Sequence, residues 1–389
     1  MNVHYWPVGI KNPQDLKLRR CDMSKYLLSD WLPSIPQNVS KDIFGWPKHI
    51  FAVNPSTGLN RYLYVRKKIG LSERHWKTVF SWMTGVIGTR RVLAEEKYRW
   101  IAPVSAFDPK RHQRFDLKQW LRYEYPPSLL KITRKRKRKN ITKLMPDYIA
   151  AKKNSSGEYE LALFESKGTK NQLRTISSIH KGQYKTWYDQ VTSARVLFDK
   201  KLQTIPRHIV VATRFNPNGP HPDSRELQIR AWNSKVEAPD ASNPLVLEIA
   251  TAYCIALCHN LSLVNTAVAI AISAHIRSGF GIFVNEQKKY LDYAISKSDT
   301  ELNEKDINRD DIKISLSPGL LQLFKCLRSP DISVSLKGLN IFESNISNWV
   351  SREISQYSEN PNISVDESGF TVECEDFIEE EYFNNTNEK

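Results

Sequence analysis

Cysteine is scarce in this chain, with 5 in 389 residues. Cys254 and Cys258 lie four residues apart, and no further cysteine or histidine completes a zinc-binding spacing around them. A disulfide framework and a zinc module are therefore excluded. We expect reduced, mostly buried thiols in a cytoplasmic protein.

Several functional signatures are absent as well. The sequence has no glycine-rich nucleotide-binding loop, no serine–histidine nucleophile signature and no internal repeat. It is therefore not expected to contain its own ATP-driven motor. The first residues, MNVHYWPVGIKNP, lack a basic segment followed by an apolar run, so we expect no signal peptide.

One long stretch, residues 249–276, contains no Asp, Glu, Lys or Arg and is long enough to cross a membrane. His259, Asn260, Ser262 and Asn265 interrupt its middle, where polar groups are costly in lipid. Two packed helices with a break at His259–Asn260 are the better interpretation. The mean hydropathy of −0.49 agrees, and we expect no membrane partner.

Positive charge is plentiful and unevenly distributed. The chain has 57 Lys+Arg against 42 Asp+Glu, a net charge of +15. Residues 299–389 hold 19 acidic and 8 basic residues, which leaves the rest of the chain with +26. A basic body with an acidic end suits a nucleic-acid partner.

Residues 144–169 predict a β-hairpin. An apolar strand over 144–151 and a strand over 159–167 flank a polar, glycine-containing turn at 152–158. Gly168 is expected to end the second strand. Because side chains alternate between the faces of a strand, Glu165 and Lys167 should share one face, and the hairpin should return Glu165 to Asp147.

This grouping suits divalent-metal chemistry. Mg²⁺ prefers carboxylate oxygens and uses phosphate as a further ligand, so Asp147 and Glu165 are the expected metal ligands, with Mn²⁺ as a possible substitute. A metal held there would polarise a phosphoryl oxygen and lower the pKa of a bound water. Lys167 is placed to orient that water or to offset charge that develops at phosphorus.

Pro146–Asp147 followed by Glu165–Ser166–Lys167 resembles the PD-(D/E)XK, or restriction-endonuclease-like, nuclease superfamily. The resemblance covers about residues 131–232. It implies an α/β fold with a mixed central sheet flanked by helices and with the acidic ligands on a β-hairpin. It also implies metal-dependent hydrolysis of phosphodiester bonds, usually in DNA.

A helix-like stretch after the hairpin contains Gln183, Trp187 and Tyr188. Some branches of the superfamily carry a glutamine there, followed by a hydrophobic residue and then an aromatic one, often tyrosine; Trp187 departs from that pattern. Gln183 is expected to hold a water or a phosphate. Gln190, two helical turns further along, is the competing choice.

The superfamily often adds an acidic residue from a helix before the first strand. A helix is predicted over residues 73–98, and Glu96 within it is a further candidate metal ligand. Glu95 and Glu124 are the alternatives. A solvated helix charge is the commoner role for each of these three glutamates.

Six consecutive cations lie just before the predicted hairpin. In a nuclease they would neutralise backbone phosphates without reading the sequence; the alternatives are a solvated loop or a localisation signal. The cations are Arg134, Lys135, Arg136, Lys137, Arg138 and Lys139.

Four regions are expected along the chain. Residues 1–130 hold seven of the ten tryptophans, interleaved with cations. We expect these tryptophans to be buried in a core. The alternative is that they are exposed and stack on nucleic-acid bases. Residues 131–236 form the nuclease core, with further strands at 207–213 and 227–232. Residues 237–298 are helical, and residues 299–389 are acidic and end in an exposed tail from residue 358.

The leading hypothesis is a Mg²⁺-dependent DNA endonuclease. A role in phage defence, restriction or mobile-element processing extends the resemblance, because large additional regions often bind partner subunits. The chain is also a candidate homo-oligomer. The alternatives are a non-catalytic nucleic-acid-binding assembly subunit with the same fold, and an RNA nuclease.

Overall fold

The computed structural model describes part of the chain. The described residues are 2–6, 14–17, 22–23, 25–26, 51–53, 63–65, 74–108, 125–134, 145–169, 182–214, 228–279, 284–303, 306–309, 312–358, 360 and 362–374.

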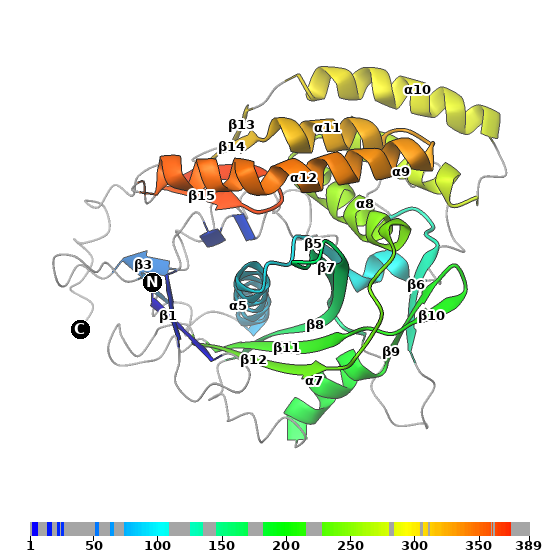
Figure 1. The fold of residues 1–389 in the computed structure, drawn as a ribbon. Helices are drawn as coiled ribbons and strands as arrows, with labels where there is room; N and C mark the ends of the chain where they lie inside the picture. The colour runs from blue at the N-terminus through cyan, green and yellow to red at the C-terminus, as the bar shows by residue number, and fades with distance from the viewer. Residues whose placement is uncertain are drawn as a thin grey trace.

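A seven-stranded mixed sheet forms the centre of the protein (Figure 1). Strand β8 pairs in parallel with β11, and β12 pairs in parallel with β1, while the other neighbours are antiparallel. The mixed α/β architecture expected from the sequence is confirmed. In sheet order the strands are β2 (Gln14–Lys17), β1 (Asn2–Trp6), β12 (Gln228–Lys235), β11 (Arg207–Arg214), β8 (Tyr159–Thr169), β7 (Tyr148–Lys153) and β5 (Trp100–Pro103).

The hairpin β7–β8 confirms the predicted strand–turn–strand unit. Tyr148 pairs with Phe164 and Lys153 with Tyr159, and Gly157 takes a left-handed φ of 87° in the turn. The prediction that Gly168 ends the second strand is wrong, because β8 continues to Thr169. Residues 161–165 are buried in succession, as expected for a central strand that is covered on both faces.

Two helices cover opposite faces of this sheet (Figure 1): α5 (Arg74–Glu95) and α7 (Gly182–Thr192) both pack on β8 and β11. Helix α5 comes unusually close to the sheet. Ser81 Oγ donates a hydrogen bond of 2.6 Å to the carbonyl oxygen of Gly168. Gly85 and Gly88 lie on the same side of α5, where an added Cβ would clash with β8 and β11 respectively.

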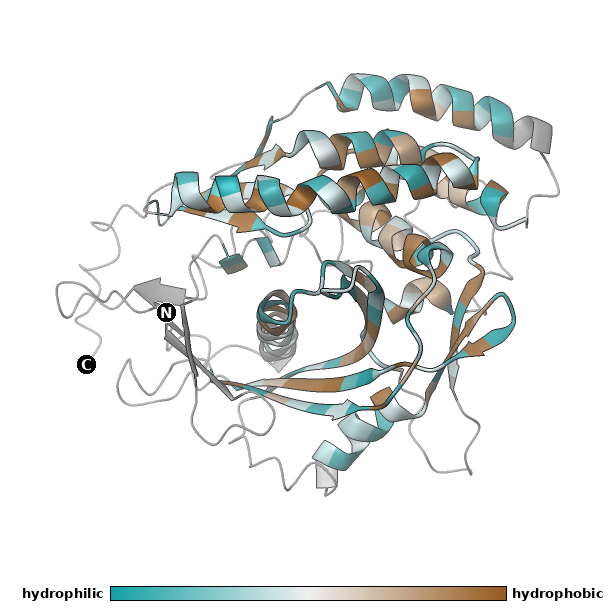
Figure 2. Ribbon diagram, viewed as in Figure 1, coloured by the Kyte–Doolittle hydropathy of each residue, from teal (hydrophilic) through white to brown (hydrophobic). Residues whose placement is uncertain are grey.

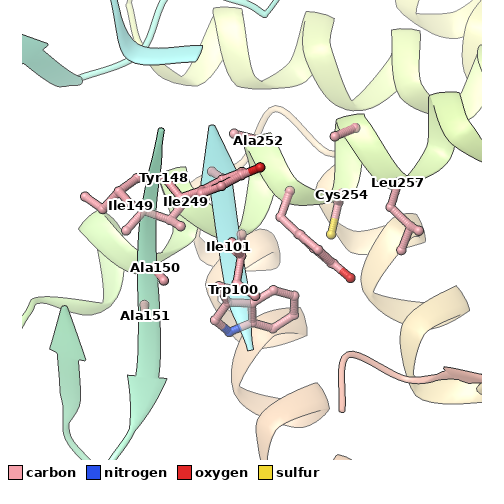
Figure 3. Packing of buried hydrophobic residues seen from close by; sticks show 14 of the residues in the cluster. Trp100, Ile101, Tyr148, Ile149, Ala150, Ala151, Ile249, Ala252, Cys254 and Leu257 are labelled. Atoms are coloured by element: carbon pink, nitrogen blue, oxygen red, sulfur yellow. The ribbon is translucent and has the colours of Figure 1, made fainter. Parts of the chain in front are cut away.

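Helices α8 (Asn243–Asn260) and α9 (Val264–Arg277) confirm the predicted pair with a break near His259–Asn260. Helix α8 packs on β5 and β7, where Ile249 and Ala252 lie near Trp100 and Ile101 (Figure 3). No helix in the described part of the chain is both long and apolar enough to span a membrane.

A small sheet at the side of the core has the order β10–β9–β6. It is built next to α7, because β9 starts two residues after that helix ends. Between β9 and β10, Asp199 and Lys200 form a tight turn with φ values of 46° and 63°. Its strands are β6 (Leu130–Arg134), β9 (Ala194–Phe198) and β10 (Lys201–Gln203).

The C-terminal part of the chain forms a helical layer with a four-stranded sheet of order β13–β14–β16–β15. In Figure 2, α10 is mainly hydrophilic, whereas α8 and α9 are largely apolar. The elements are α10 (Val284–Glu301), β13 (Asp306–Arg309), β14 (Ile312–Leu316), α11 (Pro318–Leu327), α12 (Ile332–Tyr357), β15 (Ile363–Asp366) and β16 (Phe370–Cys374). The 3₁₀ helix η2 (Val104–Phe107) follows β5, and β3 (Phe51–Val53) pairs with β4 (Leu63–Val65).

Two expected regional limits differ from the structure. Helix α5 and strand β5 lie within residues 1–130 but belong to the central sheet layer that was expected to begin at residue 131. The expected exposed tail from residue 358 instead contains β15 and β16, where Phe370 and Val372 are fully buried. Residues 375–389 lie outside the described part.

The close contact between α5 and β8 should make Gly168 intolerant of any side chain. A Cβ added at Gly168 would lie 1.6 Å from the carbonyl oxygen of Ser81, and this backbone atom cannot rotate away. We expect Gly168→Ala to lower the free energy of unfolding by about 3 kcal/mol, measured by urea titration. Gly319→Ala is the control, because its nearest neighbour would lie at 3.5 Å. Equal stability of the two variants would contradict the packing described here.

Candidate active site

The hairpin brings Asp147, Glu165 and Lys167 to one place, as predicted. Asp147 immediately precedes β7, and its N–H donates a 2.9 Å hydrogen bond to the carbonyl oxygen of Phe164. Its carboxylate oxygen Oδ2 accepts a 2.8 Å hydrogen bond from the N–H of Ser166. The backbone of β8 therefore fixes the Asp147 carboxylate between the positions of Glu165 and Lys167.

Glu165 is fully buried, with 0% of its surface exposed. Lys167 Nζ forms an ion pair with Glu165 Oε1, which agrees with their predicted position on one face of the strand. Neither carboxylate oxygen of Glu165 accepts a well-directed hydrogen bond from a described residue. A buried carboxylate with incompletely satisfied oxygens has capacity for a cation.

Burial raises the pKa of Glu165 to about 8, and the neighbouring Asp147 carboxylate adds to this effect. Lys167 and Gln190 act in the opposite direction. Burial acts to lower the pKa of Lys167, but attraction to Asp147 and then to Glu165 outweighs it, so that pKa is raised. Two carboxyl groups thus share one ammonium group, and Glu165 keeps its proton up to a pH of about 8 unless a further cation offsets its charge.

The glutamine at this site is Gln190. It is 3% exposed, and its Nε2 atom donates a 3.4 Å hydrogen bond to the carbonyl oxygen of Met145, two residues before Asp147. Tyr184 anchors α7 on the sheet through a ring contact at 5.7 Å to Trp232 of β12. The Gln183 side chain lies outside the described part, so its role stays a prediction.

The structure does not bring Glu96 to Asp147. Glu96 follows the end of α5 and lies near the other end of the hairpin, with ion-pair distances of 3.8 Å to Lys152 and 3.6 Å to Arg207. Five residues separate Asp147 from Lys152, about 17 Å along an extended strand. Glu96 therefore belongs to a structural charge cluster, in which Arg207 also contacts Glu160 at 2.9 Å.

Among the described residues, no acidic residue upstream of Asp147 joins the site as a third carboxylate. Glu95 pairs with Arg91 at 2.5 Å on α5, and Glu124 lies outside the described part. No group of three or more His, Cys, Asp and Glu side chains suited to a metal occurs among the described residues. Two carboxylates are compatible with Mg²⁺, because this ion retains several waters and takes phosphate oxygens as ligands.

The cation run starts close to the C-terminal end of α7. Arg134 ends β6 and pairs through its backbone with Ala194, which follows the end of α7, the helix that carries Gln190. Lys135, Arg136, Lys137, Arg138 and Lys139 lie outside the described residues. The backbone of Arg134 thus lies opposite a residue four positions after Gln190.

Comparison of the chain with protein-family models, with curated proteins and with solved structures gives no match. Inference about function therefore depends on the site itself. Its described members come from two adjacent strands and one helix: Asp147 and Glu165 are the acids, Lys167 is the cation, and Gln190 is the amide.

The pH dependence of stability should follow from Glu165. Its carboxyl has a pKa of about 8 in the folded chain against an ordinary value of 4.5, so the folded state holds the extra proton between these two values. In metal-free buffer, this group should lower the free energy of unfolding as the pH rises from 4.5 to 8, by up to about 1.4 kcal/mol per pH unit. Above the folded-state pKa, no further loss is expected.

Urea titrations between pH 5 and pH 8.5 in a chelator would measure this effect. Glu165→Gln cannot ionise and should flatten the decline, whereas Glu373→Gln, at an exposed position on β16, should leave it unchanged. Identical slopes for the parent protein and Glu165→Gln would show that the buried carboxyl is not the titrating group.

Proposed function

We propose that this protein is a divalent-metal-dependent DNA endonuclease of the PD-(D/E)XK type. The observation that carries the proposal is the buried Glu165 carboxylate beside Asp147 and Lys167 on a hairpin of the central sheet. The mixed sheet with α5 and α7 on opposite faces supports the same superfamily. Burial of a carboxylate next to a second acid costs folding free energy. Such a pair is therefore typical of a functional site rather than of a contact that stabilises the fold.

Each described residue of the site has a chemical task in this proposal. Asp147 and Glu165 would hold the metal through their carboxylates, and Mg²⁺ or Mn²⁺ would supply Lewis-acid polarisation of a phosphoryl oxygen and a water of lowered pKa. Lys167 offsets negative charge as it develops at phosphorus. Gln190 fixes the Met145 carbonyl that leads into Asp147 and stabilises the ionised form of Glu165.

Plasmid cleavage tests the proposal directly. Purified protein should cut plasmid DNA with Mg²⁺ or Mn²⁺ and not with a chelator, and Asp147→Ala and Lys167→Ala should each lower the rate by at least about a hundredfold. Glu96→Gln is the matched control, because it removes a carboxylate that lies away from the site, and it should cut at the parental rate.

Each other outcome selects a different function. Binding of DNA without cutting, unaffected by Asp147→Ala, would contradict catalysis and favour a non-catalytic assembly subunit. Cutting of a short RNA but not of plasmid would identify an RNA nuclease. Cleavage that survives both Asp147→Ala and Lys167→Ala would locate the chemistry elsewhere in the chain.

The basic body supports nucleic acid as the partner, and the run Arg134–Lys139 is its densest part. Replacing these six cations with glutamine should weaken DNA binding and reduce the slope of log K against log salt, because fewer counterions are released. Fluorescence anisotropy at several salt concentrations measures both quantities. Neutralising Lys288, Lys289 and Lys297, which are exposed on α10, is the control. Unchanged binding at every salt concentration would exclude the run from the interface.

A further inference from the structure

A cavity lies away from the candidate active site, between the end of α5, the hairpin β15–β16 and the last turns of α12. Its volume is about 790 Å³, which is within the usual size of small-molecule sites. Basic side chains line it from α5 and its C-terminal extension, and Ile354 and Tyr357 line it from α12. None of these groups has a task in phosphodiester hydrolysis.

Most carboxylates that line the cavity interact with neighbouring residues. Glu95 pairs with Arg91 at 2.5 Å, Asp22 accepts a 2.5 Å hydrogen bond from Ser364 Oγ, and Asp366 accepts a 2.8 Å hydrogen bond from the N–H of Ser368. These carboxylates are thus held by their own neighbours. Glu95 is neutralised by a cation, and the lining holds five Lys and Arg residues against four Asp and Glu residues, so its net charge is positive.

Two cations at the wall contribute in different ways. Lys25 is buried and donates a 3.0 Å hydrogen bond to the carbonyl oxygen of Val365 in β15. Lys97, by contrast, forms no ion pair with a described carboxylate, and its charge interacts with Glu367 only at longer range. Its ammonium group is therefore available to an incoming anion.

Lys97 also has an unfavourable backbone conformation. The N–H of Tyr98 bonds to the carbonyl oxygen of Leu93 at 2.9 Å, and the N–H of Lys97 bonds to that of Ala94 at 3.0 Å, which is the Schellman pattern that ends a helix. Lys97 has the left-handed φ of 62° that this pattern requires. Glycine would adopt this conformation at lower cost, so stability alone does not explain a lysine there.

The part of the lining that α12 supplies offers apolar surface. Ile354 is 54% exposed, and Tyr357 is half-buried one turn further along α12. A molecule that fits both kinds of lining has a flat apolar part to lie against this pair and an anionic part to reach Lys97. A nucleoside phosphate has both parts, because its base has a π-face and its phosphate accepts charge-assisted hydrogen bonds.

We propose that this cavity binds a nucleoside phosphate, with the phosphate at Lys97 and the base against Ile354 and Tyr357. The site is separate from the candidate active site and does not depend on nuclease activity.

Isothermal titration calorimetry in a chelator tests this binding with AMP, ATP and inorganic phosphate as probes. AMP and ATP should bind the parent protein, and Lys97→Gly should weaken both by at least about tenfold, because a charge-assisted hydrogen bond is lost. Glycine suits the backbone at residue 97, so the melting temperature should be equal or higher. Lys97→Asn, which also tolerates a left-handed conformation, is the second variant.

Lys200→Gly is the matched control for charge and backbone. Lys200 has a φ of 63° in the exposed β9–β10 turn and does not line the cavity, so this variant should bind as the parent protein does. Asp147→Ala should also leave binding unchanged, which separates the cavity from the candidate active site. Tyr357→Ala should weaken AMP and ATP binding without affecting inorganic phosphate.

Three results would overturn the proposal. They are the absence of AMP and ATP binding at millimolar concentration, equal weakening by Lys97→Gly and Lys200→Gly, and loss of binding in Asp147→Ala. None of these results bears on whether plasmid is cleaved, so failure here is distinguishable from failure of the proposed nuclease activity.

Discussion

A carboxylate without access to water sits in the central sheet, and the arrangement around it depends on this constraint. Glu165 cannot ionise inside the protein without compensation, because removing a charge from water costs several kcal/mol. Lys167 supplies part of that compensation from the same strand face, while Asp147 opposes it. One ammonium group cannot neutralise two ionised carboxylates, so Glu165 holds its proton up to a pH of about 8, and its ionisation would require a further cation.

The supporting structure is correspondingly rigid. Gly168 lets α5 approach β8 within hydrogen-bonding distance, and on the opposite face Tyr184 and Trp232 hold α7 with Gln190 toward the site. Both helices thus fix the segment of β8 that carries Glu165 and Lys167. Precise support of this kind is what a site needs to keep its groups in productive geometry.

Local patterns were sufficient to predict the hairpin, the strand at 207–213 and the break between α8 and α9, because strand alternation, turn residues and interrupted apolar runs act over short distances. The sequence also indicated that Asp147, Glu165 and Lys167 would meet. It offered Gln183 first and Gln190 as the alternative. Gln190 reaches the carbonyl oxygen of Met145 because α7 docks on the sheet, and no local pattern encodes that docking.

Contacts between segments that are far apart in the sequence could not be predicted. The parallel pairing of β1 with β12 joins residues more than two hundred positions apart, and no periodicity encodes it. The strands β15 and β16 lie in a stretch whose acidic composition resembles that of a tail, yet Phe370 and Val372 find a core there. The 2.6 Å hydrogen bond from Trp100 Nε1 to Glu343 also joins segments that are far apart in the sequence.

Strand β5 connects these distant parts of the chain. At its start, Trp100 donates to Glu343 of α12; just past its end, the N–H of Val104 donates a 2.9 Å hydrogen bond to the carbonyl oxygen of Asp147. A growing polypeptide exposes Asp147 long before it exposes Glu343. The last anchor of the strand beside the hairpin that carries Asp147 and Glu165 is thus acquired late in synthesis, so a ribosome-bound nascent chain holds an unfinished site while it is still close to other nucleic acids.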